Sequence, residues 1–308
     1  MKFYRLFFLL IAGLCACAAP PQVRVEVQDD GALFTEAGDT VLFYRTGPPP
    51  EPSVRTNYVH PLLALDGQVL TEDAPADHPH HRGVFWAWHQ LWVDSLRVGD
   101  GWDMTNVGWT ARSVEALDNG PARGVVAEVD WSSPLLTDHI GTDVPFVRER
   151  TTVRVYPATA HYRLVDFDLS LRALRPGVRI GGSEDAKGYG GFSPRIRLVD
   201  SLQFLSATGE VEPQNLPFAA GGWMNVVGAL GQRGATAGVA MLEHPDNPGH
   251  PNPWILRRRG SMQNVAYPGR TPVDLSGNTP LRLRYRLVIH DGDASVDVGA
   301  LHAAYGRE

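Results

Sequence analysis

Apolar and polar residues alternate with a period of two along several stretches of this 308-residue chain. In residues 281–290, leucines, Tyr285 and Ile289 fill every second position, and arginines fill most of the positions between them. This pattern indicates β-strands with one buried and one solvent-facing side, as in antiparallel sheets. It predicts further strands over residues 23–27, 124–131, 147–156, 165–171, 195–199 and 236–242.

Turn-forming clusters rich in Gly and Pro separate these segments, and the chain contains 32 Gly and 24 Pro. We therefore predict an all-β fold, a single antiparallel β-sandwich over residues 23–308 with long loops. A short C-terminal helix is expected over residues 295–305, with Asp293 as its N-cap. The long loops, where function usually lies, are expected at residues 56–111, 181–195, 213–228 and 243–270.

The N-terminal segment has a different composition from the rest of the chain. A short basic start is followed by an apolar run, Leu6–Leu14, which is too short to span a bilayer and is typical of a signal peptide. Because Leu14-Cys15-Ala16-Cys17 fits a lipobox, we predict a signal peptide over residues 1–16, acylation of Cys17 and a lipidated tether over residues 17–22. Acylation of Cys15, or a plain secretory signal cleaved near residues 16–19, are the alternatives.

The cysteines and the charge limit the compartment and the partners. Both cysteines lie in the leader, so the domain behind it has no thiol and must be held by its core without disulfides. Loss of Lys2 and Arg5 with the leader changes the formal net charge from −6 to −8. An acidic domain without a basic run argues against nucleic acid as a partner, and leaves the lipid anchor as the membrane contact. We expect a cell-envelope location, with Ala18 favouring the outer membrane of a host that has one.

The densest group of chemically active side chains is the segment 77–83, which contains His78, His80, His81 and Arg82. Imidazoles titrate near neutral pH, so beside a carboxylate and a guanidinium they can transfer protons or orient an anion. Three interpretations are open. The histidines are catalytic or substrate-binding in a carbohydrate pocket, they bind a divalent metal together with Asp77, or they are structural and bonded to backbone carbonyls.

A second cluster lies in the Gly-rich segment 184–195. Glu184 and Lys187 could supply a general base and an electrophilic partner, and Tyr189 and Arg195 could bind substrate. The alternative is a solvated, Gly-rich turn. No cofactor fingerprint is present, and we predict no cofactor beyond the open metal alternative at His78–His81.

A third cluster is a rigid loop with four prolines in the twelve residues 243–254. Amides and aromatic rings suit sugars, because amides pair with hydroxyls and an aromatic face stacks on a pyranose. The candidate substrate-binding residues of this loop and of the segment 221–228 are His244, Asn247, Asn252, Trp254, Trp223 and Asn225. A bland surface loop and a buried tight turn are the respective alternatives.

Together these motifs resemble a bacterial family labelled PmoA-like, or "methane oxygenase PmoA". The matching strings occur in order at residues 75–83, 187–191, 221–225, 244–248 and 285–290. The resemblance implies a galactose-mutarotase-like β-sandwich. By analogy with such enzymes it implies His80 or His81 as an acid, Arg82 as a cation that orients oxygen, and Glu184 as a base. The oxygenase activity in the label is not expected, since a membrane oxygenase subunit needs transmembrane helices and this chain has none.

These observations predict an exported carbohydrate-active enzyme that acts on a sugar or keto-glycoside by acid–base chemistry. A proton next to a sugar carbonyl would be removed by a His or Glu, and Arg82 or Lys187 would stabilise the enolate oxygen. Epimerase, lyase, hydratase and hydrolase activities are all compatible with these residues. The rivals are a non-catalytic glycan-binding lipoprotein and a metal-dependent hydrolase or lyase.

Overall fold

The computed structural model describes residues 22–47, 55–118 and 120–308, and the predicted signal peptide and Cys17 lie outside this range. All strand pairings between its named strands are antiparallel, which confirms the predicted all-β antiparallel fold. Among these residues, no helix is both long and apolar enough to cross a membrane.

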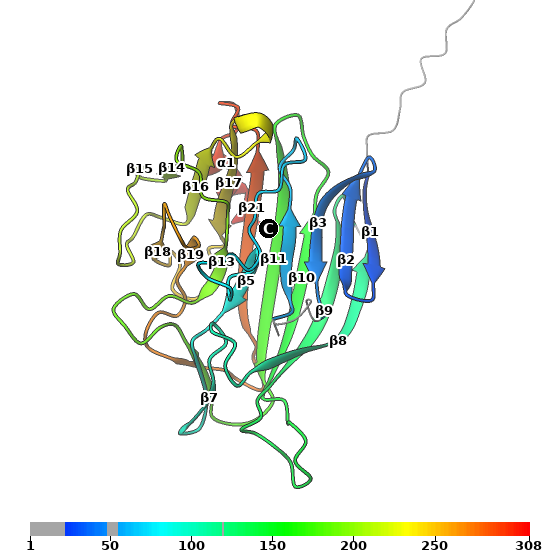
Figure 1. The fold of residues 1–308 in the computed structure, drawn as a ribbon, viewed down its shortest axis with the longest axis vertical. Coiled ribbons are helices and arrows are strands. Elements are labelled where there is room, and N and C mark those ends of the chain that lie inside the picture. The colour runs from blue at the N-terminus through cyan, green and yellow to red at the C-terminus, as the bar shows by residue number, and fades with distance from the viewer. Residues whose placement is uncertain (1–21, 48–54, 119) are drawn as a thin grey trace, which may run out of the picture.

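Two large sheets form the body of the molecule (Figure 1). The six-stranded sheet has the order β1 (Val23–Gln28), β2 (Gly31–Glu36), β3 (Asp39–Arg45), β4 (Tyr58–Leu62), β5 (Val84–Ala87) and β13 (Gly191–Pro194). The nine-stranded sheet has the order β15 (Gly209–Glu210), β14 (Gln203–Ser206), β16 (Trp223–Gly228), β17 (Ala237–Glu243), β21 (Leu281–His290), β11 (Tyr162–Ala173), β10 (Val147–Val155), β9 (Arg123–Ser132) and β8 (Gly108–Leu117).

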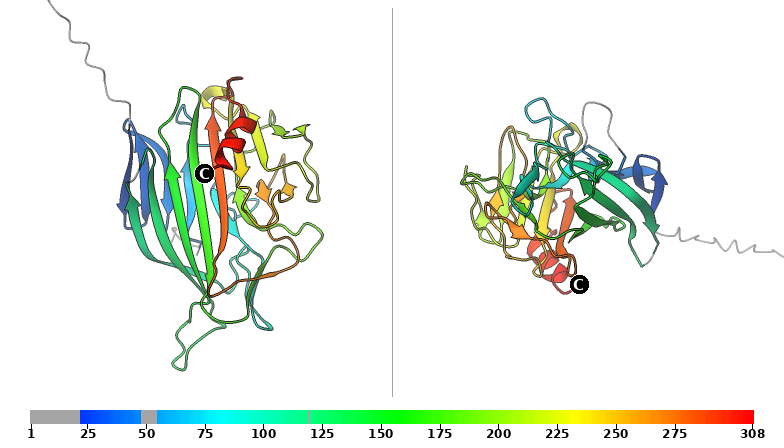
Figure 2. Two further views of the ribbon diagram at one scale, coloured as in Figure 1. Left: turned by 180° about the vertical axis from the view of Figure 1, so that it is seen from behind. Right: turned by 90° about the horizontal axis from the view of Figure 1, so that it is seen from below.

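Two small sheets and two short helices complete the described part of the chain. The small sheets are β20 (Val273–Asp274), β12 (Val178–Gly181), β6 (Gln90–Val93) and β7 (Leu96–Gly99), and the pair β18 (Trp254–Ile255) and β19 (Asn264–Val265). The helices are the 3-10 turn η1 (Gln232–Gly234) and α1 (Val298–Tyr305). Strand β1 lies at one flank of the molecule, and β18 and β19 lie at the opposite flank in both views (Figures 1 and 2).

The core lies between the two large sheets. Phe192 of β13 stacks on Tyr285 of β21 with ring centroids 4.4 Å apart, and its edge meets Phe167 of β11 at 5.1 Å. Each of these rings is almost completely buried. Alternate residues of the long strands supply the rest of this layer, as the period of two requires.

One carboxylate is buried inside this core. Glu149 of β10 is fully buried and accepts hydrogen bonds from the indole of Trp86 at 2.6 Å, from the indole of Trp131 at 2.9 Å and from the hydroxyl of Thr151. Trp86 belongs to the six-stranded sheet and the other two residues to the nine-stranded sheet. The carboxylate therefore links the sheets through polar bonds within an apolar layer.

Three local predictions were wrong. Residues 195–199 contain only an isolated bridge at Ile196, because the strand of this region, β13, ends at Pro194. The C-terminal helix begins at Val298 rather than Ser295, since Asp297, not Asp293, accepts the hydrogen bond from Ala300 and caps it. The expected loops also contain strands: β4 to β7 and the start of β8 lie in 56–111, β13 in 181–195, β16 in 213–228, and β18 and β19 in 243–270.

Candidate functional site

The histidine segment folds as two consecutive turns that are closed at their base. The N–H of His78 donates to the carbonyl of Pro75 at 3.0 Å, and the N–H of His81 donates to the carbonyl of His78 at 2.9 Å. At the base, Ala74 donates to the carbonyl of His81. The turns place three imidazoles from four consecutive positions together at the surface of the six-stranded sheet.

The three imidazoles contact one another. The rings of His78 and His81 are stacked with centroids 4.6 Å apart, and His80 meets each of them edge-on, at 5.6 Å and 4.6 Å respectively. His81 is buried at the base of the group against Phe85 and Trp102. The side chains of His78 and His80 are 36% and 26% exposed, so they are the two imidazoles that a ligand can reach.

A buried guanidinium holds the group from behind. Arg195 is 3% exposed and donates to Glu72 at 2.7 Å and to both carboxylate oxygens of Asp77 at 3.0 and 3.1 Å. Asp77 in turn lies 3.2 Å from Nδ1 of His78. Burial opposes ionisation of Asp77, but the bonds from His78 and Arg195 outweigh it and lower the pKa of this carboxyl. The ionised carboxylate can therefore orient the imidazole of His78 through its Nδ1.

Burial keeps the other two imidazoles neutral. It lowers the pKa of His81 to about 2, with the neighbouring His80 and His78 adding to the effect. Burial also lowers the pKa of His80, although the Asp103 carboxylate, 4.0 Å from its Nε2, acts in the opposite direction. A neutral and partly exposed imidazole such as His80 can accept a proton near neutral pH.

A cavity of about 320 Å³ opens beside the histidines. Strand β18, the loop that follows it, and the segments around residues 102 and 188 form its other walls. Its lining residues are His78, His80, His81, Trp102, Asp103, Lys187, Tyr189, Ile255, Arg257, Arg259, Gly260, Ser261 and Met262. This is within the size range of small-molecule sites, and the lining combines aromatic rings with convergent polar groups.

An aromatic stack supports the cavity. Trp102 packs parallel to His89 with centroids 5.4 Å apart, and the edge of Tyr189 meets both rings at 4.8 to 4.9 Å. The carboxylate of Asp100 fixes His89 through Nδ1 at 2.9 Å. These contacts hold Trp102 and Tyr189 in the wall of the cavity.

Another set of side chains has its ligand atoms grouped as a metal site would require. Within the described ranges, ligand atoms of His89, Asp100 and Asp103 lie within 4.8 Å of one another, and the three histidines of the segment 78–81 are not grouped in this way. Asp100 already accepts bonds from His89, from two backbone N–H groups and from Arg97. Its oxygens are therefore engaged by donors of the protein itself.

Two predicted catalytic residues lie outside this cavity. Glu184 is exposed and forms an ion pair of 2.6 Å with Arg97. Arg82 is buried behind the turn and donates to Asp73 at 3.2 Å. Lys187 and Tyr189 do line the cavity, and Arg195 acts behind it.

The candidates of the proline-rich loop are engaged in hydrogen bonds of that loop and its neighbours. Trp254 is fully buried and donates to the carbonyl of Gly221, and Asn252 is bonded to the buried carboxylate of Glu243. Asn247 exchanges two hydrogen bonds with the backbone of Arg284. These bonds satisfy the amides within the protein.

The remaining candidates also lie outside the lining. Asn225 is bonded to His290 at 2.9 Å, and both are buried. His244 is buried against Tyr305 of α1, and Trp223 packs on the same helix cluster. None of these residues is among those lining the histidine cavity.

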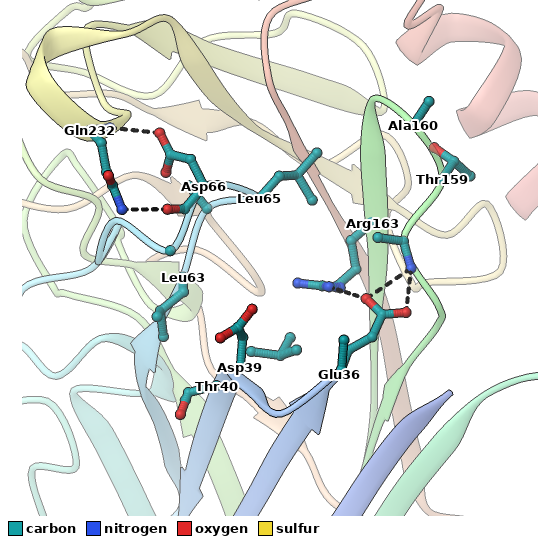
Figure 3. Close-up of a pocket in the computed structure, with 15 residues that line it drawn as sticks. Glu36, Asp39, Thr40, Leu63, Leu65, Asp66, Thr159, Ala160, Arg163 and Gln232 are labelled. Carbon is teal, nitrogen blue, oxygen red and sulfur yellow. Dashed lines mark hydrogen bonds and ion pairs between the residues drawn. The ribbon is translucent and has the colours of Figure 1, made fainter. Parts of the chain in front are cut away.

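A larger cavity, of about 670 Å³, lies elsewhere, between the β2–β3 turn and the loop before β11. Figure 3 shows its charged walls. Glu36 is paired with Arg163 and also accepts the N–H of Ala158, while Asp66 accepts from Gln232. Glu36 and Arg163 thus neutralise each other, and the cavity contains none of the predicted site residues.

The geometry defines the protein as an antiparallel β-sandwich with an imidazole-lined cavity. Comparison with known protein families then assigns the chain to one of them. Residues 32–304 match the model of the "Family of unknown function (DUF6807)", and the chain belongs to this family. No curated protein sequence matches it.

Among solved structures, the chain is similar to a crystal structure described as a "putative mutarotase (YeaD)" from Salmonella typhimurium. The two are 12% identical with a TM-score of 0.35, and the match covers 88% of each chain. Neither comparison names the PmoA-like proteins, so that resemblance stays a prediction.

Proposed function

We propose that this protein is a carbohydrate-active enzyme that removes a proton from the carbon next to a sugar carbonyl. The observation that carries the proposal is the pair of partly exposed imidazoles, His78 and His80, at the wall of one cavity. One has an ionised carboxylate behind it, and the other is kept neutral by burial. Acid–base catalysis needs one group that accepts a proton and one that donates it, and the two imidazoles have different surroundings.

The surroundings assign a role to each group. Neutral His80 accepts the proton from carbon. His78, which Asp77 orients, donates a proton to the oxygen or to the opposite face of the carbon. Lys187, at the rim, can neutralise the charge that develops on the carbonyl oxygen. Arg195 is a positioning residue, because it touches Asp77 rather than the cavity.

A sugar is the substrate class that the lining fits best. Hydroxyl groups pair with imidazole, carboxylate and ammonium groups, all of which line this cavity, while Trp102 and Tyr189 supply apolar surface. Aliphatic side chains are almost absent from the lining. An apolar ligand would leave these polar groups unpaired, at a cost in binding free energy.

The direct test is proton exchange in heavy water. The soluble domain, expressed without the leader, is incubated in D2O with 3-keto-glycosides and their parent sugars and followed by ¹H NMR. We expect loss of the signal of one carbon-bound hydrogen, whichever product follows. Saturable binding without exchange or product would instead establish a glycan-binding protein.

Asp103 gives a prediction on pH dependence. Its carboxylate raises the pKa of His80, so Asp103→Asn should lower that pKa further below its ordinary value. Because His80 must be neutral to act as a base, the acidic limb of the kcat/KM profile should move to lower pH. Asp29→Asn, an exposed carboxylate outside the cavity, is the matched control. An unmoved or upward-moved limb would exclude His80 as the base.

We also propose that the chain is exported and anchored through Cys17. Cys17→Ser should abolish acylation, so the protein should move from the membrane fraction to the soluble fraction of the envelope and lose palmitate labelling. Cys15→Ser is the control and should leave both unchanged. Labelling that follows Cys15, or no labelling at all, would contradict the assignment.

A further inference from the structure

The charge of the histidine cavity is opposite to that of the whole chain. Its lining contains three cationic side chains, Lys187, Arg257 and Arg259, and one carboxylate, Asp103. The chain carries a formal net charge of −6. His80 and His81 are kept neutral by burial, so these two imidazoles add little to either sign. The cavity is therefore a local positive region in an acidic protein.

Of the three cations, Arg257 is the one held in the wall of the cavity by backbone carbonyls. Its guanidinium donates to the backbone carbonyls of Gln214 at 2.6 Å, Leu256 at 2.9 Å and Asn215 at 3.3 Å. Within the described ranges, no carboxylate lies within 4.0 Å of it. It is half-buried, and burial lowers its pKa. A half-buried cation with carbonyl partners alone retains its full charge, which an anion would neutralise.

The other two cations lie at the rim. Lys187 is 42% exposed and lies 3.4 Å from Asp185, and Arg259 is 90% exposed and lies 3.9 Å from Asp200. Both ion pairs are exposed to solvent, where such pairs are weak. Arginine and lysine around one opening are the groups that bind carboxylate and sulfate oxygens.

We infer that the substrate is an anionic sugar, with a carboxylate or sulfate group that Arg257 binds with help from Lys187 and Arg259. This inference rests on the proposed function, because it names the substrate class of the same cavity. It also explains why an acidic protein would concentrate positive charge at this opening: the field attracts an anion that the rest of the surface repels.

The test compares matched pairs of sugars. Methyl glucosides and methyl galactosides are each used as the neutral sugar, the C6 carboxylate and the O6 sulfate, and binding is measured by isothermal titration calorimetry at low and moderate salt. We expect at least one charged form to bind about tenfold or more tightly than its neutral twin, because charge-assisted hydrogen bonds exceed neutral ones by about that factor. The carboxylate and sulfate arms distinguish the two sources of charge.

Variants test the assignment to these residues. Arg257→Gln should abolish the preference for the charged form, and Arg257→Lys should restore part of it. Because Arg257 also holds backbone carbonyls, the rim variants Lys187→Gln and Arg259→Gln provide a second measurement that does not depend on that loop. Arg233→Gln removes an exposed cation outside the cavity and should leave the preference unchanged.

Equal binding of charged and neutral twins, or a preference that survives Arg257→Gln and both rim variants, would overturn the inference. The proposed function would still stand if neutral keto-glycosides exchanged their proton in D2O. If no sugar of either kind bound or exchanged, both would fail.

Discussion

Replacing His80 by alanine is expected to lower turnover at least 100-fold, with substrate binding changed much less. The imidazole is neutral because of burial, is partly exposed, and lines the cavity, so its loss removes the group that accepts the proton. General bases contribute about 10²- to 10⁴-fold to enzymatic rates. His78→Ala should cause a loss of similar size, since it removes the partner that Asp77 orients. The measurement is the rate of deuterium exchange at saturating sugar.

His139→Ala is the matched control for both variants, because His139 is exposed and lies outside the cavity. Binding is measured in parallel by calorimetry, so that a folding or binding defect is separated from a loss of chemistry. Full turnover in either His78→Ala or His80→Ala would show that the histidine mechanism is wrong. His81 contributes by packing under the other two rings.

Removing the buried carboxylate of Glu149 is expected to destabilise the whole sandwich. Glu149→Ala leaves the indole N–H groups of Trp86 and Trp131 and the hydroxyl of Thr151 without their acceptor in a dry core. Each unsatisfied donor costs about 1–3 kcal/mol, and the emptied volume adds to this. We expect a loss of roughly 3–5 kcal/mol in the free energy of unfolding, measured by urea denaturation.

The same variant should change the pH dependence of stability. Burial raises the pKa of Glu149 above 4.5, although its hydrogen bonds oppose the shift. An acid whose pKa is raised in the folded state contributes stability below its unfolded pKa and loses it as pH rises through the folded value. Glu149→Ala should therefore flatten the stability curve above about pH 4.5. Glu128→Ala on the neighbouring strand, partly exposed, should change stability by less than about 0.5 kcal/mol.

If Glu149→Ala lowered the free energy of unfolding by no more than Glu128→Ala does, the carboxylate would not link the sheets. Glu149→Gln adds a second measurement with little loss of volume. The NH2 group of the glutamine amide is a donor and would face an indole N–H, which is also a donor. We therefore expect this variant to lower the stability of the fold as well.

The long strands were predictable from the sequence because apolar and polar residues alternate along them. Residues 281–290 and 147–156 alternate and form β21 and β10 almost as expected. Strands β5 and β13 were missed because all four residues of each are buried. A strand buried on both faces has no alternation for the sequence to display.

The candidate site was predictable only where it is local in sequence. His78, His80 and His81 come from one turn, so their spacing alone placed them together. Trp102 and Arg257 join them from distant loops that only the sheet pairings bring close. Trp102 gave no such signal, whereas Arg257 begins a run of three arginines, residues 257–259, which is the local signal that the prediction missed.

In the proline-rich loop, by contrast, the sequence suggested substrate-binding residues that the structure shows bonded within the protein. Its amides and indole have the composition of a sugar site, but a loop with four prolines has few backbone donors to hold itself. Asn252 and Asn247 supply those bonds instead, to Glu243 and to the backbone of Arg284. Polar residues in such a loop are first required by its own backbone.

The position of β1 determines how a lipid-anchored domain would face the membrane. This strand begins at Val23, directly after the predicted tether, and forms the edge of its sheet on the flank opposite β18 (Figure 1). The loop after β18 lines the histidine cavity. A lipid on Cys17 would therefore hold the domain by its far flank and turn the opening away from the bilayer. Saccharides arriving by diffusion would meet the open side first, without crossing the headgroup layer.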